Sequence, residues 1–275
     1  MCTIANFRFL SSIHPKLDSP ACCVDSQSPI AVACHGVEMT FKSGKQSFQA
    51  LKGIDLEVKS GSIQLLMGPS GSGKTTLLSI LAGLLTPTKG KVCLLGHDIT
   101  AMSRSQLAEF RLHNIGFIFQ KFNLFPALTA SENVEIVLKM KGVSDKEIKK
   151  EAQHLLTSVG LADKGDVLPR DLSGGQQQRV AIARALAGSP KLIMADEPTA
   201  ALDSYNGHAV IELLARLAKQ EGCTVVMVTH DPRIVDVADR VVSLEDGILQ
   251  SRASTSGRVQ NIRKSGQNAL AFGAA

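Results

Sequence analysis

Residues 68–75, Gly-Pro-Ser-Gly-Ser-Gly-Lys-Thr, constrain the fold more than any other segment, because they fit the phosphate-loop pattern G-x-x-x-x-G-K-[ST]. Glycines at these positions let successive backbone N–H groups turn toward one anion, and a following helix points its positive end at the same place. An apolar run at 63–67 precedes the loop, and a helix-like run at 76–82 follows it. A chance Gly/Ser turn would not require this order, so the segment predicts an α/β fold that binds phosphate.

Two side chains of this loop carry specific chemistry. Lys74 places a positive charge for the β- and γ-phosphates of a nucleotide, and the hydroxyl of Thr75 can bind Mg²⁺. The loop by itself is shared by kinases, GTPases, helicases and transporters, so the function depends on other motifs. The candidate phosphate-binding residues are Gly68, Pro69, Ser70, Gly71, Ser72, Gly73, Lys74, Thr75 and Thr76.

The second motif is an apolar run that ends in two acids, at residues 192–197. A buried strand would deliver Asp196 to its carboxyl end beside the phosphate loop, where the carboxylate could hold Mg²⁺. Glu197 comes one residue later, points elsewhere, and could polarise an attacking water. The alternative is a strand-end acidic pair that only faces solvent.

Residues 172–179, Leu-Ser-Gly-Gly-Gln-Gln-Gln-Arg, resemble the signature motif of ATP-binding cassette (ABC) ATPases. Ser173 and two glycines stand before a predicted helix at 176–187, which gives a second anion-binding nest. A plain helix cap with a flexible entry is the alternative, and the position of Ser173, 23 residues before Asp196, argues against it. The resemblance covers about residues 35–250.

Further marks of the ABC family follow in the family's order. Gln120 comes directly after an apolar run, as the Q-loop glutamine does, and His230 follows another, as the switch histidine does. Residues 201–203, which end in Asp203, resemble the D-loop. A lone histidine after an apolar strand is usually structural, but the ordered set of motifs favours the functional interpretation.

An aromatic residue is the least specific of these marks. Phe41 stands where the family often has an adenine-stacking tyrosine, and it keeps the stacking face without the hydroxyl. Phe48 is a nearby competitor, and ordinary core packing is the other alternative.

The resemblance implies a mechanism in which two cassettes close head to tail around two ATP molecules, so that a single-cassette chain must dimerise. Each ATP would contact the phosphate loop of one chain and the signature of the other. The implied catalytic residues are Glu197 as general base, with His230, Gln120 and Lys74; the implied Mg²⁺ ligands are Thr75, Gln120 and Asp196; and the implied ATP contacts outside the phosphate loop are Phe41, Ser173, Gly174, Gly175, Gln176 and Asp203.

The patterning along the chain is compatible with such a cassette. Short alternating apolar segments between 30 and 59 predict antiparallel strands. The stretch 103–188 is expected to be a helical insertion, because apolar residues recur at helical spacing in 103–113, 130–140 and 144–159. Continuous apolar runs at 192–195, 224–229 and 241–244 predict buried parallel strands. The resemblance implies a RecA-like parallel core, an N-terminal antiparallel β subdomain and a helical subdomain at about 121–188.

The expected organisation is one cassette at 30–250 between two extensions. Residues 1–29 lack clear periodicity and are expected to be a flexible extension, and residues 251–275 are expected to be a disordered basic tail. This tail holds four basic and no acidic residues, so most of the net charge of +5 lies there. With that charge outside the body, and with one tyrosine and no tryptophan, nucleic-acid binding is not predicted.

The location follows from the hydropathy of the chain. No apolar run approaches the roughly 20 residues that cross a bilayer, and the first 25 residues lack the apolar core of a signal peptide. The chain is therefore expected to be cytoplasmic and peripheral on the inner face of the plasma membrane, where a separate permease supplies the membrane part.

Three segments resemble one branch of the family, the lipoprotein-release and macrolide-export group. They are residues 117–124, the Ser-Glu-Asn-Val run at 131–134 and residues 195–199. That group commonly reads Thr-Gly-Asn-Leu-Asp where this chain reads Thr-Ala-Ala-Leu-Asp at 199–203, a version that resembles cyanobacterial DevA-type exporters. The resemblance implies export of a lipid, lipoprotein or small molecule, with a periplasmic adaptor as a further partner.

Two other functions share the catalytic motifs. An FtsE-like ATPase would regulate cell-wall hydrolases through a membrane partner and transport nothing. Soluble ABC proteins of translation usually carry two cassettes, and those of DNA repair carry a long coiled coil between the motifs; the sequence shows neither feature.

Overall fold

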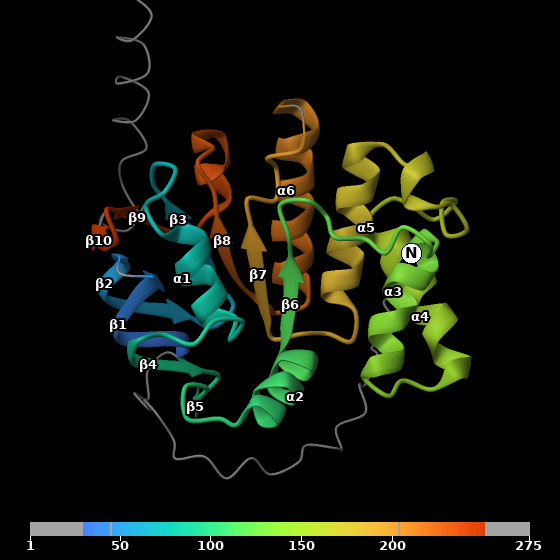
Figure 1. Cartoon of the computed structure of the whole chain (residues 1–275). Helices are drawn as coiled ribbons and strands as arrows, with labels where there is room; N and C mark the ends of the chain where they lie inside the picture. The colour runs from blue at the N-terminus through green and yellow to red at the C-terminus, as the bar shows by residue number, and fades with distance from the viewer. Residues whose placement is uncertain (1–29, 45, 203, 251–275) are drawn as a thin grey trace, which may run out of the picture.

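The computed structural model of the chain describes residues 30–44, 46–202 and 204–250 (Figure 1). The predictions for residues 1–29 and 251–275 concern segments outside these ranges. The strands are β1 Ile30–Ser43, β2 Gln46–Lys59, β3 Ile63–Met67, β4 Lys89–Leu94, β5 His97–Asp98, β6 Ile115–Ile118, β7 Leu192–Asp196, β8 Thr224–Val228, β9 Arg240–Glu245 and β10 Ile248–Gln250. The helices are α1 Lys74–Leu81, α2 Arg104–Asn114, α3 Ala130–Met140, α4 Asp145–Ser158, α5 Gly174–Leu186 and α6 Ser204–Gln220, with 3₁₀ turns η1 Pro169–Asp171 and η2 Pro232–Val237.

The strands form two sheets. One is antiparallel with the order β2-β1-β4-β5, and the other has the order β10-β9-β3-β8-β7-β6. Within the second sheet the five strands from β9 to β6 run parallel, and β10 pairs antiparallel with β9. This arrangement confirms the predicted α/β class with a parallel core and an N-terminal antiparallel sheet.

The central parallel strands β3, β8 and β7 are buried on both faces, and alternate residues enter different hydrophobic clusters. In β8, Val225 and Met227 face the cluster that includes residues of α3, α4, α5 and α6. Val226 and Val228 face the cluster that includes α1 and the antiparallel sheet. Because every residue of β8 is buried, the strand reads as a continuous apolar run, which is why the sequence identified it.

The predicted helical stretch at 103–188 is interrupted by a strand. Residues 115–118 form β6, which pairs in parallel with β7, from Ile115 opposite Leu192 to Ile118 opposite Ala195. A four-residue apolar run has too few turns for its periodicity to separate helix from strand, so the pairing with β7 decides its structure. Helices α3, α4 and α5 pack together beyond β6 (Figure 1). Within the described ranges, no helix combines the length and apolar character needed to cross a bilayer.

Helix α5 packs directly on β6 at a glycine. A methyl group added to Gly116 would lie 2.1 Å from the carbonyl oxygen of Ala185 in α5. We expect Gly116→Ala to lower the free energy of unfolding by about 1–3 kcal/mol, because the backbones must separate to accept the new carbon. Urea denaturation measures the loss.

Gly165→Ala is the matched control for this prediction. The nearest atom to its added methyl group is Gln153 Oε1 at 3.6 Å, an ordinary van der Waals contact. We expect its midpoint to stay near that of the unmodified protein. Equal midpoints for the two variants would contradict the close packing of α5 on β6.

Candidate functional site

The phosphate loop joins β3 to α1 and is enclosed by backbone on two sides. Gly68 has φ 151°, and a methyl group there would lie 2.0 Å from the carbonyl oxygen of Leu244 in β9. Gly73 has φ 100°, and a methyl group there would lie 2.8 Å from the carbonyl oxygen of Ala50 in β2. Both positions therefore need glycine for conformation and for space. The loop is a close-fitting cradle whose shape is set by β9 and β2.

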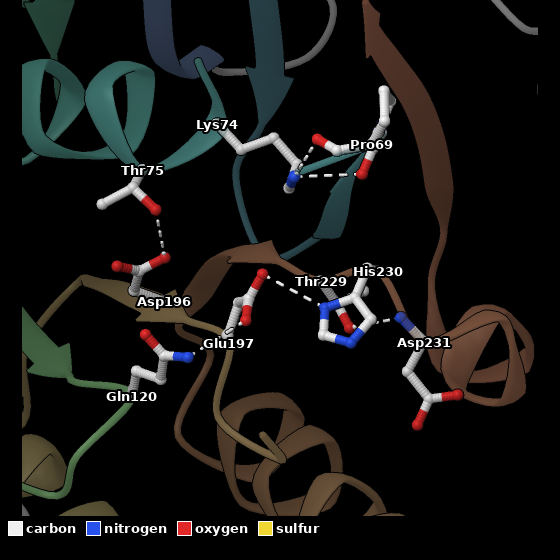
Figure 2. A network of polar contacts seen from close by, with 10 residues as sticks. Pro69, Lys74, Thr75, Gln120, Asp196, Glu197, Thr229, His230 and Asp231 are labelled. Carbon is white, nitrogen blue, oxygen red and sulfur yellow. Dashed lines mark hydrogen bonds and ion pairs between the residues drawn. The ribbon is translucent and has the colours of Figure 1, made fainter. Parts of the chain in front are cut away.

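The polar groups of this loop suit an anion. Lys74 is buried, and its Nζ donates to the carbonyl oxygens of Gly68 at 3.0 Å and Pro69 at 2.7 Å, which holds the ammonium inside the loop (Figure 2). Ser72 Oγ is buried and makes no hydrogen bond to the described residues. A buried hydroxyl without a partner costs free energy unless a ligand completes it, so the loop fits a bound phosphate.

The carboxyl ends of the parallel strands bring the other predicted residues to the same place. Thr75 Oγ1, in the first turn of α1, donates to Asp196 Oδ1 at the end of β7 over 3.0 Å. Gln120 Nε2, beyond the end of β6, donates to Glu197 Oε2 at 3.3 Å. His230 Nδ1, beyond the end of β8, lies 3.2 Å from Glu197 Oε1 (Figure 2). Five residues predicted from four separate motifs thus form one cluster.

The backbone conformation of Glu197 could not be predicted from the motif at 192–197. Its φ is 43°, in the left-handed region, and its N–H donates to the carbonyl oxygen of Val228 at 2.9 Å. Such a conformation costs about 1–3 kcal/mol for a residue with a side chain. It turns the chain at the end of β7, so that the carboxylates of Asp196 and Glu197 serve different partners: Thr75 for the first, Gln120 and His230 for the second.

Burial raises the pKa of the Asp196 carboxyl, and this is the largest influence on it. The hydrogen bond from Thr75 and the charge of Lys74 act in the opposite direction, and the negative charge of Glu197 raises the pKa further. A half-buried carboxylate next to a second one favours a nearby cation. The oxygen atoms of Thr75, Asp196 and Gln120 are the donors that Mg²⁺ prefers, so the set fits this ion.

The signature residues begin α5. Ser173 Oγ accepts a hydrogen bond from the Gln176 N–H at 3.3 Å, and Gln176 Oε1 accepts one from the Ser173 N–H at 2.9 Å, a capping box. Ser173, Gly174 and Gly175 therefore do form a helix cap. This does not contradict a role in anion binding, because the helix start still presents backbone N–H groups.

The signature is remote from the phosphate loop of the same chain. In the sheet β6 is the third strand from β3, about 14 Å away at about 4.8 Å per strand. Helices α1 and α5 lie on opposite sides of β6 and β7 (Figure 1). The signature therefore lies beside a different part of the sheet from the phosphate loop of the same chain.

The structure describes the predicted aromatic residue but not the D-loop aspartate. Phe41 in β1 pairs directly with Phe48 in β2, and their exposed fractions are 42% and 63%. Neither ring is a core residue, which removes the core-packing alternative, and base stacking by Phe41 stays a prediction. Asp203 lies outside the described residues.

Two residues that the motif search did not single out hold the segment after Gln120. Arg184 of α5 donates to the carbonyl oxygens of Phe122 and Asn123. Asn133, in the Ser-Glu-Asn-Val run, is buried and bonds to the backbone of Phe125 through both its Oδ1 and its Nδ2. The family resemblance of the Ser-Glu-Asn-Val run drew attention to Asn133 but did not predict its contacts with Phe125. No local sequence pattern indicates the contacts of Arg184.

The comparisons with known proteins agree with the site. The model of a family described as ABC transporter matches residues 51–200. The methionine import ATP-binding protein MetN of Corynebacterium diphtheriae is 47% identical over 213 residues, which cover 77% of this chain and 62% of MetN. The macrolide export ATP-binding/permease protein MacB of Syntrophobacter fumaroxidans is 43% identical over 230 residues, which cover 83% of this chain and 32% of MacB. The chain therefore spans less than two thirds of either relative.

One solved structure is similar to this chain along the whole length of the solved chain. The dimeric, post-hydrolysis ATP-binding cassette MJ0796 bound to ADP and Pi has a TM-score of 0.77 and 42% sequence identity. The match covers 82% of this chain and 100% of that one.

Asp196→Asn tests the electrostatics of the cluster. The folded pKa of Asp196 lies above its unfolded value, so at neutral pH the ionised carboxylate weakens the fold; this penalty is relieved as pH falls through the folded pKa. We expect the variant, which still accepts the Thr75 bond, to have a Tm a few degrees higher at pH 7.5 in EDTA, with a smaller difference at acid pH. A lower Tm at pH 7.5 would contradict the burial of charge. Thermal unfolding across the pH range measures it.

Proposed function

Because this chain belongs to the ABC transporter family, as one of its ATP-hydrolysing cassettes, we propose that it is the nucleotide-binding subunit of an exporter and drives a separate membrane permease. The observation that carries the nucleotide-hydrolysing part of the proposal is the cluster at the carboxyl edge, formed beside the phosphate loop by Thr75, Asp196, Glu197, Gln120 and His230. The cargo class is a lipid, lipoprotein or small molecule.

In the proposed reaction the chain positions ATP and moves one proton. The backbone N–H groups of residues 68–75 and the ammonium of Lys74 bind the phosphates. Glu197, held by Gln120 and His230, accepts a proton from the attacking water as its oxygen bonds to the γ-phosphorus and ADP leaves. Most of the acceleration comes from positioning and charge stabilisation.

Mg²⁺ fits the oxygen donors of this cluster. Thr75, Asp196 and Gln120 would hold it, and when bound it would neutralise charge on the phosphate oxygens. Burial, and to a smaller extent the charge of Glu197, raises the pKa of Asp196, and this supports the assignment because a bound cation would favour the ionised carboxylate.

A second copy of the chain completes the proposed site. In this arrangement, which the family resemblance implies, Ser173, Gly174 and Gly175 would serve the nucleotide of the partner copy, and two ATP molecules would lie between two chains. The separation of β3 from β6 by about 14 Å is compatible with it. The dimeric form of MJ0796 supports this arrangement. ATP then favours the closed dimer because only that state offers it both surfaces, and hydrolysis reopens it.

The exporter assignment rests on the branch that the chain resembles. MacB carries macrolide export in its name, whereas MetN carries methionine import, so similarity alone leaves the direction open. Residues 117–124, 131–134 and 195–199 favour the macrolide-export group. With a permease and a periplasmic adaptor as partners, the chain would work at the inner face of the plasma membrane.

Glu197→Gln should lower ATP hydrolysis about a hundredfold or more, because the amide cannot accept the proton. Binding is retained, so ATP should trap the variant as a dimer on size exclusion. Lys74→Ala is the control, since it removes the charge for the phosphates and should weaken nucleotide binding and abolish the trapped dimer. A Glu197→Gln protein that stays monomeric in saturating ATP would count against the two-chain site.

Capture of partners tests the exporter assignment. The tagged chain is purified from detergent-solubilised membranes, and its partners are identified by mass spectrometry. We expect a permease together with a periplasmic adaptor. Cell-wall hydrolase regulators would indicate the FtsE-like function, a substrate-binding protein would indicate import, and a wholly soluble set of partners would overturn the membrane assignment.

A further inference from the structure

The segment that follows Gln120 has a conformation that its own residues do not favour. Phe122 and Asn123 have φ values of 57° and 49°, both in the left-handed region. Asparagine tolerates this region better than most residues, but a phenylalanine there is uncommon. Two consecutive left-handed residues need support from elsewhere in the structure.

Arg184 provides that support from α5. Its guanidinium donates through Nη2 to the carbonyl oxygen of Phe122 at 2.7 Å and through Nη1 to that of Asn123. The side chain is nine-tenths buried, and in the part of the chain that the structure describes it forms no salt bridge with a carboxylate. A buried cation is costly, and here its hydrogen bonds go to the two strained peptide units.

The ring of Phe122 also lies near the start of α5. A methyl group on Gly174, at the start of α5, would lie 4.0 Å from Cζ of Phe122. Further along the segment, Asn133 Nδ2 bonds to the carbonyl oxygens of Phe125, Leu128 and Thr129. The hydrogen bonds of Asn133 therefore hold residues 125–129, whereas Arg184 of α5 bonds the two carbonyl oxygens of the turn at 122–123.

Two residues before the turn, Gln120 reaches the cluster. Its Nε2 donates to Glu197 Oε2 at 3.3 Å, a bond long enough for a small backbone displacement to break it. Because the backbone from 120 to 123 is continuous, the position of the turn sets the reach of Gln120. Arg184 thus links α5, which begins with the signature, to the carboxylate of Glu197.

We propose that Arg184 is a positioning residue that acts through Gln120: it locks the left-handed turn at 122–123 to α5 and so aligns Gln120 with Glu197. The inference rests on the proposed roles of Gln120 and Glu197. The clamp, as we call the hydrogen bonds from Arg184 to the carbonyl oxygens of Phe122 and Asn123, would then transmit a movement of α5 to Glu197. Such a movement would occur when the signature of α5 meets ATP in the partner copy.

A double-mutant cycle in the full-length chain tests the inference. Arg184→Lys keeps the charge but cannot donate to both carbonyls in the same geometry. We expect kcat of Mg²⁺-ATP hydrolysis to fall about ten- to a hundredfold while the Kd for ATP is unchanged. In a Gln120→Ala background the same substitution should have no further effect on kcat, because its route to Glu197 is already lost.

Lys141→Gln is the matched control. Lys141 also uses its ammonium group to bond backbone carbonyls, at Ala187 over 2.7 Å and at Gly188 over 3.3 Å, and these lie after α5 and not in the turn. We expect a lower Tm and an unchanged kcat. A kcat loss in Lys141→Gln equal to that in Arg184→Lys would overturn the specific role of Arg184.

Asn123 gives a second route that leaves Arg184 intact, should Arg184→Lys fail to fold. Asn123→Val disfavours the left-handed conformation and should lower kcat as Arg184→Lys does, whereas Asn123→Gly keeps that conformation accessible and should stay near the original kcat. Equal kcat values for the two Asn123 variants would overturn the inference.

The outcomes separate this inference from the proposed function. If Gln120→Ala lowers kcat and the effect of Arg184→Lys multiplies with it, only the clamp is wrong. If Gln120→Ala leaves kcat unchanged, the proposed role of Gln120 fails and the inference fails with it. Non-additive losses with unchanged ATP binding support both.

Discussion

The hydrogen bond from Thr75 to Asp196 joins the first turn of α1 to the carboxyl end of β7, 121 residues later. In the sheet β8 lies between β3 and β7, so the bond crosses over one strand and fixes the phosphate loop relative to the acidic residues. Glu197 is the next residue, and its contacts with Gln120 and His230 connect the acidic residues to the segments that follow β6 and β8. Each catalytic role that we propose depends on this shared edge.

Sequence reasoning succeeded where residue order or periodicity carries the information. The order of the motifs predicted the fold and the family, and the helical spacing at 130–140 predicted α3 within its observed bounds. It failed for β6, whose four residues are strand-like only because β7 pairs with them, and it did not identify α6. The roles assigned to single site residues remain predictions that the proposed variants test.

Other features of the site could not be predicted because they depend on distant backbone. Glycine at position 68 was expected for its conformation. The close approach of the Leu244 backbone, which also requires glycine there, could not be predicted because Leu244 lies in a strand about 175 residues later. The left-handed conformation of Glu197 has no local signal, since most such residues are glycine or asparagine. Arg184 is likewise defined by two carbonyl oxygens that belong to another segment.

The capping box at Ser173 has a consequence for how one hydroxyl can be shared. The oxygen of Ser173 uses a lone pair to accept the Gln176 N–H, which leaves the hydroxyl hydrogen free to donate. The helix cap and an anion in front of α5 therefore use opposite ends of the same O–H group and do not compete. A hydroxyl that accepts a hydrogen bond becomes a stronger donor, so the bond that starts the helix would also strengthen the proposed hydrogen bond from Ser173 to a phosphate oxygen.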